Sequence, residues 1–306
     1  MKVYESLKES PVATAVALGS FDGIHLGHQK VIAQTMDLPG LSPTVLTFAE
    51  NPLCDLGGHA GGELITRQQK ILILESLGVE QLYILEFRDI MHFSPEEFVD
   101  EILQKVCHAK KVCCGFNYTF GAGGRGTEKT LETLCEKRGI ETAVVPAVLE
   151  GGEPISSTRI RGLVARGNMG EAARLLGRPY GYFGTVCHGR RLGHSLGTPT
   201  LNQRVPQSFV LPRFGVYVSR VLFDGKHYCG VTNVGIKPTV GSKEVLAETW
   251  MPFYEGPDLY GKEIQTELLH FQRPEQKFPS IEALKEQIRK DGKAALEFYA
   301  RNRNFS

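Results

Sequence analysis

A glycine- and histidine-rich turn near the amino terminus constrains the fold of this chain more than any other stretch. It reads Gly19-Ser20-Phe21-Asp22-Gly23-Ile24-His25-Leu26-Gly27-His28. An apolar run without alternation precedes it at residues 12–18, which is typical of a strand buried on both faces of a parallel sheet. Helix-forming residues follow it, so the turn is predicted to join the end of a strand to the start of a helix. Such a junction favours an anion, because unpaired N–H groups and the helix dipole point at it.

Two histidines three residues apart lie in this turn. His25 and His28 would project on the same side of the first helical turn, and Gly27 between them leaves room for a close ligand. The pair is therefore suited to contact a phosphate. Two other interpretations stay open: His25 caps the helix while His28 is a surface residue, or the two ligate a metal, although zinc usually takes three or four ligands.

Apolar runs recur through the first half of the chain and alternate with helical patterns. The runs cover residues 12–18, 44–48, 81–85, 111–116 and 142–146. Helical spacing places Ile71, Leu74 and Leu77 on one stripe, and Phe98, Ile102 and Val106 on another. Strands that alternate with helices predict an α/β fold with a doubly wound parallel sheet.

From about residue 180 the pattern changes to alternating segments separated by glycine and proline turns. The candidate strands cover residues 182–187, 214–223, 227–234 and 263–271. Their spacing predicts a small antiparallel β-barrel. A final helix over residues 280–300 would cover the barrel with a stripe that carries Ile281, Leu284, Ile288 and Leu296. The predicted domains are residues 1–178 and 180–306.

A glycine-rich stretch at residues 115–127 follows the fourth strand of the predicted sheet. It contains Asn117 and Tyr118 and is too rich in glycine for a buried element. Ligands of such sheets bind beyond the carboxyl ends of the strands, so the stretch is predicted to be a mobile loop near the histidine turn. A plain surface connection is the alternative.

Hydroxyl residues and arginines meet at residues 155–161. Ser157 precedes a helix that also carries Arg159 and Arg161. The hydroxyl of Ser157 or Thr158 is either an N-cap, which contributes about 1 kcal/mol, or part of a site in which the arginines bind a polyphosphate. Both interpretations stay open.

A second glycine-rich stretch covers residues 184–202 in the predicted barrel. Its glycines include Gly184, Gly189, Gly193 and Gly197, and they end in Pro199-Thr200-Leu201-Asn202. Glycines let backbone N–H groups approach phosphates closely. Thr200 and Asn202 would face one way on an extended segment and offer two oxygens to Mg²⁺. A glycine-rich corner of the barrel is the alternative.

The charge balance and the cysteines exclude several classes of protein. With 35 basic and 34 acidic residues the formal net charge is +1, so the excess positive charge typical of nucleic-acid or membrane-surface binding is missing and small-molecule ligands are expected. The seven cysteines are scattered without a Cys-x-x-Cys, which predicts reduced thiols and a cytoplasmic location. No stretch approaches the roughly 20 apolar residues of a membrane span. Self-association is compatible with the sequence, but no feature indicates it.

Taken in order, these motifs resemble the bacterial bifunctional riboflavin kinase/FMN adenylyltransferase family along essentially the whole chain. The histidine turn is similar to the family's His-x-Gly-His nucleotidyltransferase motif, and residues 117–121 and 155–161 match two further motifs of that domain. Four more motifs match the kinase domain: residues 199–202, 233–239, 258–261 and 273–278. Seven motifs in the same order hardly arise by chance.

For residues 180–306 the resemblance implies a riboflavin kinase that transfers phosphate from ATP and produces FMN. Glu248 aligns with the family's catalytic glutamate and would act as the base for the riboflavin hydroxyl. Thr200 and Asn202 would hold Mg²⁺, while the glycine-rich loop positions the phosphates.

For residues 1–178 the resemblance implies an FMN adenylyltransferase that produces FAD and pyrophosphate from FMN and ATP. No base is needed, because a phosphate monoester with a second pKa of about 6 is ionised at neutral pH. His25 and His28 would act at the reacting phosphate. The remaining ATP-binding residues implied are Gly19, Phe21, Gly27, Ser157 and Arg161, with Asn117 and Tyr118 on a loop over the nucleotide or flavin.

The sequence departs from the family's pattern in two places. Asn51 stands where the family usually has the histidine of a Pro-His-Pro, and residues 249–257 replace the usual His-x-x-Asp-Phe after Glu248. Three rival interpretations follow. The kinase half is inactive and the enzyme only makes FAD; the chain is a different nucleotidyltransferase, for example one that uses CTP; or it is a flavin-binding regulator without catalysis.

Overall fold

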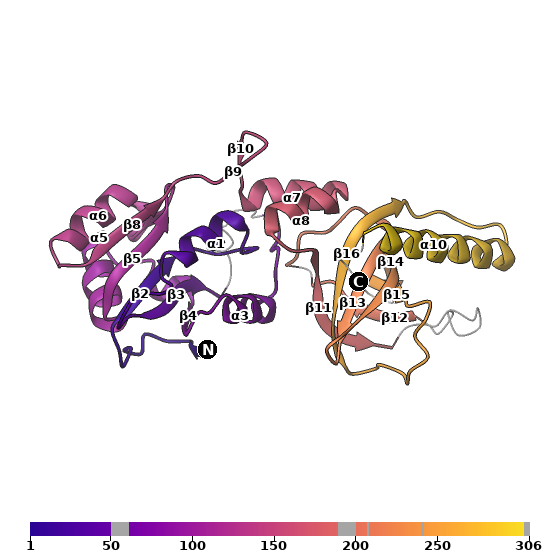
Figure 1. Ribbon diagram of the computed structural model, residues 1–306, viewed down its shortest axis with the longest axis horizontal. Coiled ribbons are helices and arrows are strands. Elements are labelled where there is room, and N and C mark those ends of the chain that lie inside the picture. Colours follow the sequence, from indigo (N-terminus) through magenta and orange to yellow (C-terminus); the bar gives the residue numbers. More distant parts are fainter. Residues whose placement is uncertain (50–60, 189–199, 207, 240–241, 303–306) are drawn as a thin grey trace. The chain divides into compact units, whose positions relative to one another are not determined.

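The computed structural model describes residues 1–306 except 50–60, 189–199, 207, 240–241 and 303–306. Contacts divide the chain into two compact units, a sheet unit and a barrel unit (Figure 1). The sheet unit comprises Met1–Glu63 and Arg67–Ser157, and the barrel unit comprises Leu64–Thr66 and Thr158–Ser306.

The sheet unit is built from short strands and helices that alternate along the chain. Its strands are β1 (Lys2–Tyr4), β2 (Thr14–Leu18), β3 (Ser42–Phe48), β4 (Gln81–Leu85), β5 (Ala109–Gly115), β6 (Thr119–Phe120), β7 (Gly126–Thr127), β8 (Glu141–Val145), β9 (Leu149–Glu150) and β10 (Glu153–Pro154). Its helices are α1 (Leu26–Ala33), α3 (Arg67–Ser76), α4 (Phe87–Ile90), α5 (Pro95–Glu97), the π-helix η1 (Phe98–Val106), the 3₁₀ turn η2 (Ala122–Gly124) and α6 (Glu128–Glu136).

Six strands form the predicted doubly wound parallel sheet, in the order β1-β4-β3-β2-β5-β8. All five strands predicted from the apolar runs are present, and β1 adds an edge strand of three residues that is too short to show a periodic pattern. After β2, the chain adds β3 on one side of β2, and it later adds β5 on the other side. The order therefore reverses between β2 and β5, and ligands of such sheets bind at this point, beyond the carboxyl ends of the strands.

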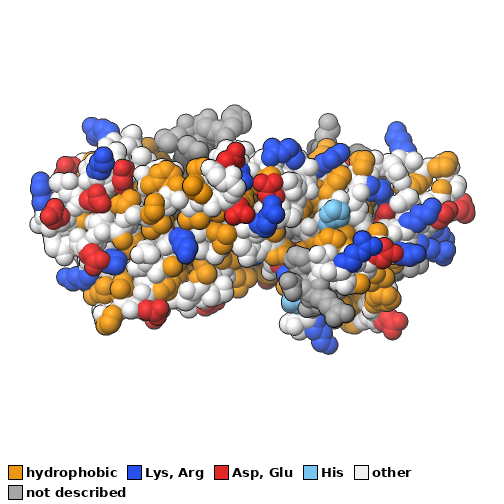
Figure 2. Space-filling view, turned by 45° about the horizontal axis from the view of Figure 1, so that its top comes forward, with side chains coloured by type: hydrophobic (Ala, Val, Ile, Leu, Met, Phe, Trp, Pro, Cys, Tyr) orange, Lys and Arg blue, Asp and Glu red, His pale blue; other side chains and the backbone are white. Residues whose placement is uncertain are grey.

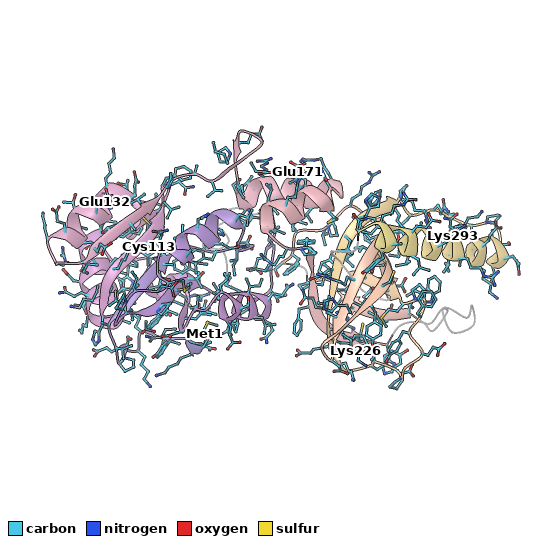
Figure 3. All side chains as sticks on the ribbon, in the orientation of Figure 1. Met1, Cys113, Glu132, Glu171, Lys226 and Lys293 are labelled. Atoms are coloured by element: carbon cyan, nitrogen blue, oxygen red, sulfur yellow. The ribbon has the colours of Figure 1, made fainter. Side chains whose placement is uncertain are left out.

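One large hydrophobic core packs strand side chains of this sheet against two of its helices. It combines strand residues such as Val16 and Val112 with Phe98 and Ile102 of η1 and Leu131 of α6. The predicted stripe of Phe98, Ile102 and Val106 is thus confirmed as buried, although the helix that carries it has π rather than α hydrogen bonding. Figure 3 shows Cys113 on β5, where its side chain is fully buried.

The glycine-rich stretch after β5 is more ordered than a plain loop. Residues Thr119–Phe120 and Gly126–Thr127 pair as a short antiparallel hairpin. Gly126 is buried, and a Cβ there would lie 2.6 Å from the ring of Phe120, so glycine permits this close packing.

The barrel unit contains the predicted closed antiparallel barrel. Its strands are β11 (Tyr180–Cys187), β12 (Thr200–Arg204), β13 (Gly215–Phe223), β14 (Lys226–Thr239), β15 (Ser242–Trp250) and β16 (Glu263–Arg273), in the order β11-β12-β15-β14-β13-β16. Two of these, β12 and β15, were not among the predicted strands. The interior is partly polar: the hydroxyl of Thr232 donates to that of Ser219 over 2.6 Å and lies 2.8 Å from that of Thr249.

Helices α7 (Ser157–Arg166) and α8 (Met169–Leu176) group with the barrel, whereas the predicted domains placed both with the sheet. Arg159 of α7 forms an ion pair with Glu171 of α8 over 3.2 Å, and Figure 3 labels Glu171 on this helix pair. The turn between the two helices packs on the barrel, since a Cβ on Gly167 would lie 3.4 Å from Phe271.

Helix α10 (Ile281–Arg301) packs on β13 and β14, and the predicted stripe of Ile281, Leu284, Ile288 and Leu296 is partly buried. Its buried residues are Asp291, Gly292 and Ala295, while Ile281 is 60 % exposed. Leu284 and Ile288 lie on the same helix face as these three residues and are half-buried. Asp291 accepts hydrogen bonds from Arg273, and Gly292 lies against Trp250, whose ring would be 2.6 Å from a Cβ at that position.

Candidate active sites

The two histidines of the first turn are held face to face at the start of α1. Their rings stack with centroids 3.6 Å apart and planes 16° apart. His25 is 5 % exposed and is the N-cap of α1, where its Nδ1 accepts a hydrogen bond from the backbone N–H of His28 over 3.2 Å. The capping interpretation is therefore confirmed for His25. Because Nδ1 is an acceptor, the proton of the neutral ring lies on Nε2, which is left as a donor.

Gly27 and Phe21 support this stack from two sides. A Cβ on Gly27 would lie 3.1 Å from Cε1 and Nδ1 of His25, so any larger residue would force the ring to shift from its place over the helix start. Phe21 is buried and its ring meets His28 edge-on at 5.3 Å. Gly19 in turn leaves room for Phe21, whose ring would be 3.1 Å from a Cβ on Gly19. These three predicted ATP-binding residues thus shape the histidine pair.

The backbone of the turn is strained. Phe21 and Ile24 have φ angles of 47° and 39°, in the left-handed region that L side chains rarely adopt. Each such residue costs about 1–3 kcal/mol and persists only where the surroundings fix it, as they do at many functional sites. The hydroxyl of Thr47 donates to the carbonyl of Ser20 over 2.9 Å and is one of the contacts that hold the turn.

The second predicted motif reaches the same turn. The hydroxyl of Ser157, the first residue of α7, donates to the backbone carbonyl of Asp22 over 2.9 Å. Ser157 is thus a tether between the two motifs, a contact made across 135 residues. Arg161 lies one helical turn farther along α7.

Asn117 and Tyr118 follow β5, next to β2 at the carboxyl edge of the sheet. Asn117 is exposed, whereas Tyr118 packs against the core and stacks on Phe120 at 5.9 Å. Burial raises the pKa of the Tyr118 hydroxyl well above its usual range. Asn117 is therefore the more accessible of the two. Asn51, the first of the two departures from the family's pattern, lies outside the described residues.

The candidate kinase site is a row of three polar residues on adjacent barrel strands. Glu248 of β15 is in register with Asn202 of β12 on one side and Asn233 of β14 on the other. Residues in register share a face of the sheet, so the three side chains lie together. Thr200 lies two residues before Asn202 on that same face. The residues next to them in the sequence, such as Thr249 and Gln203, face the other side of the sheet and fill the barrel interior.

Asn202 carries a buried acceptor in this row. The residue is 3 % exposed, and its Oδ1 has no hydrogen-bond partner among the described residues. A buried acceptor of this kind costs free energy unless a donor or a cation reaches it. The Asn202 carbonyl is engaged separately, since it accepts from the thiol of Cys187 over 3.3 Å.

Sequence reasoning gave no role to Asn233 or Glu275, although both lie in matched motifs. Asn233 donates to Glu275 over 3.2 Å, and a Cβ on Gly235 would lie only 2.2 Å from the Glu275 carboxylate. The motifs at residues 233–239 and 273–278 are therefore packed together beside Glu248. Their membership in these two motifs was the sequence signal that could have identified both residues.

The predicted glycine loop is only partly described. Gly184 lies inside β11, where its carbonyl accepts from Gln203 over 2.9 Å, so it belongs to the barrel wall rather than to the loop. The alternating pattern of residues 180–187 explains this, because it extends the strand through the glycine. Gly189, Gly193 and Gly197 lie outside the described residues.

The unusual segment after Glu248 packs on the end of the barrel. Met251 and Leu259 are buried there. Tyr254 meets the rings of Tyr228 and Phe223 edge-on, at 5.4 and 5.7 Å. The altered sequence thus forms an aromatic cluster against β13 and β14, while Phe253 remains 73 % exposed.

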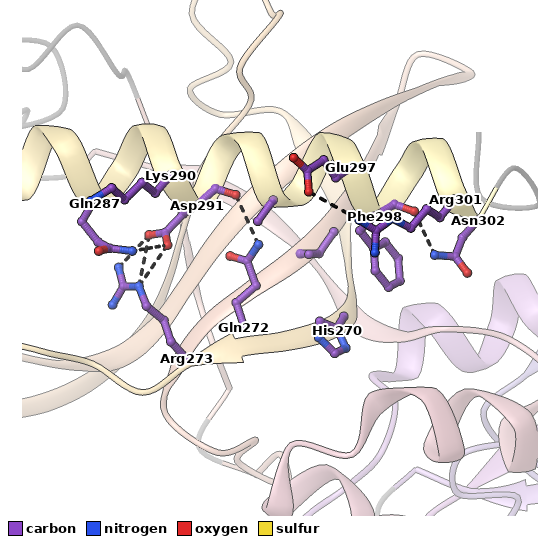
Figure 4. Close-up of a pocket in the computed structure, with 12 residues that line it drawn as sticks. His270, Gln272, Arg273, Gln287, Lys290, Asp291, Glu297, Phe298, Arg301 and Asn302 are labelled. Carbon is purple, nitrogen blue, oxygen red and sulfur yellow. Dashed lines mark hydrogen bonds and ion pairs between the residues drawn. The ribbon is translucent and has the colours of Figure 1, made fainter.

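A groove of about 570 Å³ beneath α10 is a separate feature (Figure 4). It is lined from β13, β16 and α10, whereas the Glu248 row lies on β12, β15 and β14. Its cations are ion-paired: Arg273 with Asp291, Lys290 with Glu286 and Arg301 with Glu297. The groove therefore offers no excess positive charge to a phosphate.

Two other features are absent from the part of the chain that the structure describes. No cluster of three or more His, Cys, Asp or Glu side chains there could hold a metal ion. No helix there is both long and apolar enough to cross a membrane. On the face shown in Figure 2, acidic and basic side chains are interspersed.

Comparisons with known proteins agree with the two units. A family model described as FAD synthetase matches residues 7–159, and one described as riboflavin kinase matches residues 176–299. The bifunctional riboflavin kinase/FMN adenylyltransferase of Bacillus subtilis is 36 % identical, over 96 % of this chain and 95 % of the relative. The corresponding protein of Listeria monocytogenes is 34 % identical, over 94 % of this chain and 92 % of the relative.

A solved structure is also similar over nearly the whole length. It is described as a macrolide-efflux protein from Streptococcus pneumoniae, and it aligns with a TM-score of 0.86 at 30 % identity, covering 96 % of this chain and 99 % of that one. The two family models, the identities and the coverage lead to one conclusion. This chain belongs to the bifunctional riboflavin kinase/FMN adenylyltransferase family.

Proposed function

We propose that this chain phosphorylates riboflavin to FMN in its barrel unit and adenylylates FMN to FAD in its sheet unit, using ATP in both reactions. Family membership supports both activities. The observation that carries the kinase assignment is the register that sets Glu248 beside Asn202. The observation that carries the adenylyltransferase assignment is the stacked histidine pair at the start of α1.

In the kinase reaction, Glu248 is the general base. The 5′-hydroxyl of riboflavin is a weak nucleophile, and a carboxylate that takes its proton as the new P–O bond forms lowers the barrier. The γ-phosphoryl group then passes to that oxygen, and ADP leaves. Asn233, held by Glu275, lies on the other side of Glu248 and is placed to orient the carboxylate or the flavin.

Mg²⁺ fits the same row. Asn202 offers a buried amide oxygen without a partner among the described residues, and Thr200 offers a hydroxyl two residues away on the same face. Oxygen donors of this kind suit Mg²⁺, which keeps several waters and binds substrate phosphates. When bound, the ion would neutralise charge on the phosphates of ATP. The glycines of residues 189–197 are proposed to position those phosphates by their backbone N–H groups.

In the adenylyltransferase reaction, a phosphate oxygen of FMN attacks the α-phosphorus of ATP. One P–O bond forms, the bond from the α-phosphorus to the bridging oxygen breaks, and pyrophosphate leaves with the electron pair. Catalysis then depends on donors that are already in place. His25 donates through Nε2, because its Nδ1 is occupied by the helix N–H. His28 stacks beside it and presents the second imidazole.

Ser157 and Arg161 are proposed to act on the phosphates as well. Ser157 ties the start of α7 to the histidine turn through Asp22. Arg161 carries a guanidinium that suits the departing pyrophosphate, because it presents several donors in a fixed plane. Asn117 is proposed to cover the nucleotide or the flavin from the loop after β5. The free thiols of the described cysteines fit a reducing cytoplasm.

A flavin product assay tests both assignments on one chain. Riboflavin, ATP and Mg²⁺ are incubated with the wild type, and the flavins are separated. Both FMN and FAD are expected. In His28→Ala, FAD formation from supplied FMN is expected to fall by about 10²-fold, the scale of one lost transition-state donor, with riboflavin phosphorylation unchanged.

Glu248→Gln is the reciprocal variant. It is expected to lose riboflavin phosphorylation by about 10²-fold or more, the typical contribution of a general base, and to keep FAD synthesis from FMN. Each variant is thus the control for the other. If either substitution reduced both activities equally, the two-site assignment would be wrong. A wild type that makes FAD but no FMN would support an inactive kinase half.

A further inference from the structure

Lys70 is a buried cation that no sequence motif singled out. It lies on α3, is 8 % exposed, and follows the equally buried Gln69. Lysines are rarely buried unless their ammonium group is paired. Its spacing could have indicated this burial from the sequence. Lys70 lies four residues before the fully buried Leu74, and this spacing places both on the inward face of the helix.

The ammonium group of Lys70 links the carboxyl ends of two neighbouring strands of the parallel sheet. Nζ donates to the carbonyl of Ser20 over 3.1 Å and to that of Phe48 over 3.2 Å. Ser20 belongs to the turn after β2, and Phe48 is the last residue of β3. The two carbonyls converge on one cation, so the histidine turn is anchored to the neighbouring strand.

This anchor acts on a strained segment. Phe21, directly after Ser20, has the first of the two left-handed φ angles, and its ring supports His28. A backbone in that region returns to an ordinary conformation unless its neighbours are fixed. Together with the hydroxyl of Thr47, Lys70 fixes the carbonyl immediately before the strained residue.

The charge of Lys70 also lies at the carboxyl ends of β2 and β3, the edge at which ligands of such sheets bind. Burial lowers the pKa of its ammonium group, while the carboxylates of Asp22 and Glu63 raise it. Carbonyls that end parallel strands are acceptors, and without a cation two of them would face the anionic substrate. A buried cation below the turn counters that repulsion more strongly than an exposed one, because water screens it less.

We propose that Lys70 is a positioning residue for adenylyl transfer: by binding the Ser20 and Phe48 carbonyls it holds the histidine turn in place and provides positive charge beneath the triphosphate of ATP. The inference rests on the proposed adenylyltransferase function. It assigns Lys70 no direct contact with the reacting atoms.

Lys70→Met tests this role, because it keeps the length of the side chain and removes the charge and the donors. FAD formation from FMN is measured at varied ATP, and riboflavin phosphorylation on the same samples is the internal control. We expect kcat/KM for ATP to fall about 10- to 100-fold, the range of a lost hydrogen bond to a charged group, with a raised KM and unchanged kinase activity. Lys70→Arg, which keeps the charge and donors, is expected to recover at least tenfold over Lys70→Met.

Lys30→Met is the matched control. Lys30 is exposed at the last turn of α1, so the same chemical change there is expected to leave both activities unchanged. A purely structural role of Lys70 would lower the folded fraction and hence kcat at an unchanged KM for ATP; that result, or wild-type kinetics in Lys70→Met, would overturn the proposal. If Lys70→Met does not fold, an unchanged KM in Lys70→Gln would overturn it equally. A wild type without FAD synthesis would instead refute the proposed function.

Discussion

Replacing Gly27 by alanine separates the stability of the histidine turn from its activity. The new Cβ would lie 3.1 Å from Cε1 and Nδ1 of His25, whereas carbon atoms in contact lie about 3.5–4.0 Å apart. The ring must therefore move by about 0.5 Å. That shift lengthens the cap from Nδ1 to the His28 N–H, now 3.2 Å, to about 3.7 Å, beyond a hydrogen bond.

Two opposing terms decide the stability of this variant. Loss of the N-cap costs about 1 kcal/mol, and alanine in place of glycine in a helix stabilises by about 0.5–1 kcal/mol. The net change in the free energy of unfolding is thus within about 0.5 kcal/mol. Activity has no such compensation. A 1 Å misplacement of a catalytic group costs about 10²-fold, so a shift of half that size predicts about a tenfold loss of adenylyl transfer.

The measurement is FAD formation from FMN and ATP, with riboflavin phosphorylation and thermal unfolding by circular dichroism on the same preparation. Gly170→Ala is the matched control. Gly170 is also the second residue of its helix, α8, but a Cβ there meets nothing within 4 Å. It is expected to keep both activities. If Gly27→Ala formed FAD at more than half the wild-type rate, the steric argument for the histidine pair would be refuted.

Three further predictions concern burial and charge. Asp291→Ala leaves Arg273 of the barrel without its carboxylate and is expected to cost about 3 kcal/mol of stability, measured by urea unfolding with the fluorescence of the single tryptophan. Burial raises the pKa of Cys107 to about 12, so its thiol should resist iodoacetamide at pH 8 until the chain is unfolded, which mass spectrometry detects. The hydrogen bond from Arg138 lowers the pKa of Asp100 below the ordinary value of 3.8. The stability that this pair contributes is present at neutral pH and is lost as the pH falls below the pKa of the free carboxyl. Asp100→Asn should therefore weaken the acid dependence of Tm between pH 5 and pH 2.

Local patterns were sufficient for most of the strands and for placing the first turn between a strand and a helix. Five apolar runs became five strands of one parallel sheet, because a strand buried on both faces must be apolar throughout. Gly27 was predicted to leave room for a ligand, whereas in the structure it leaves room for the ring of His25. The edge strand β1 was missed, since three residues carry no periodic signal, and β12 and β15 of the barrel were missed as well.

The sequence by itself determined which residues can do chemistry: two imidazoles at a helix start, a hydroxyl and an amide two residues apart, and a glutamate that gained meaning only through the family resemblance. Tertiary structure decided which of them meet. Strand register set Glu248 between Asn202 and Asn233, and packing buried Lys70 against two strand ends. The physical reason is the distance along the chain over which each effect acts. Propensity and periodicity act over a few residues, whereas register and burial arise from contacts between segments far apart in the chain.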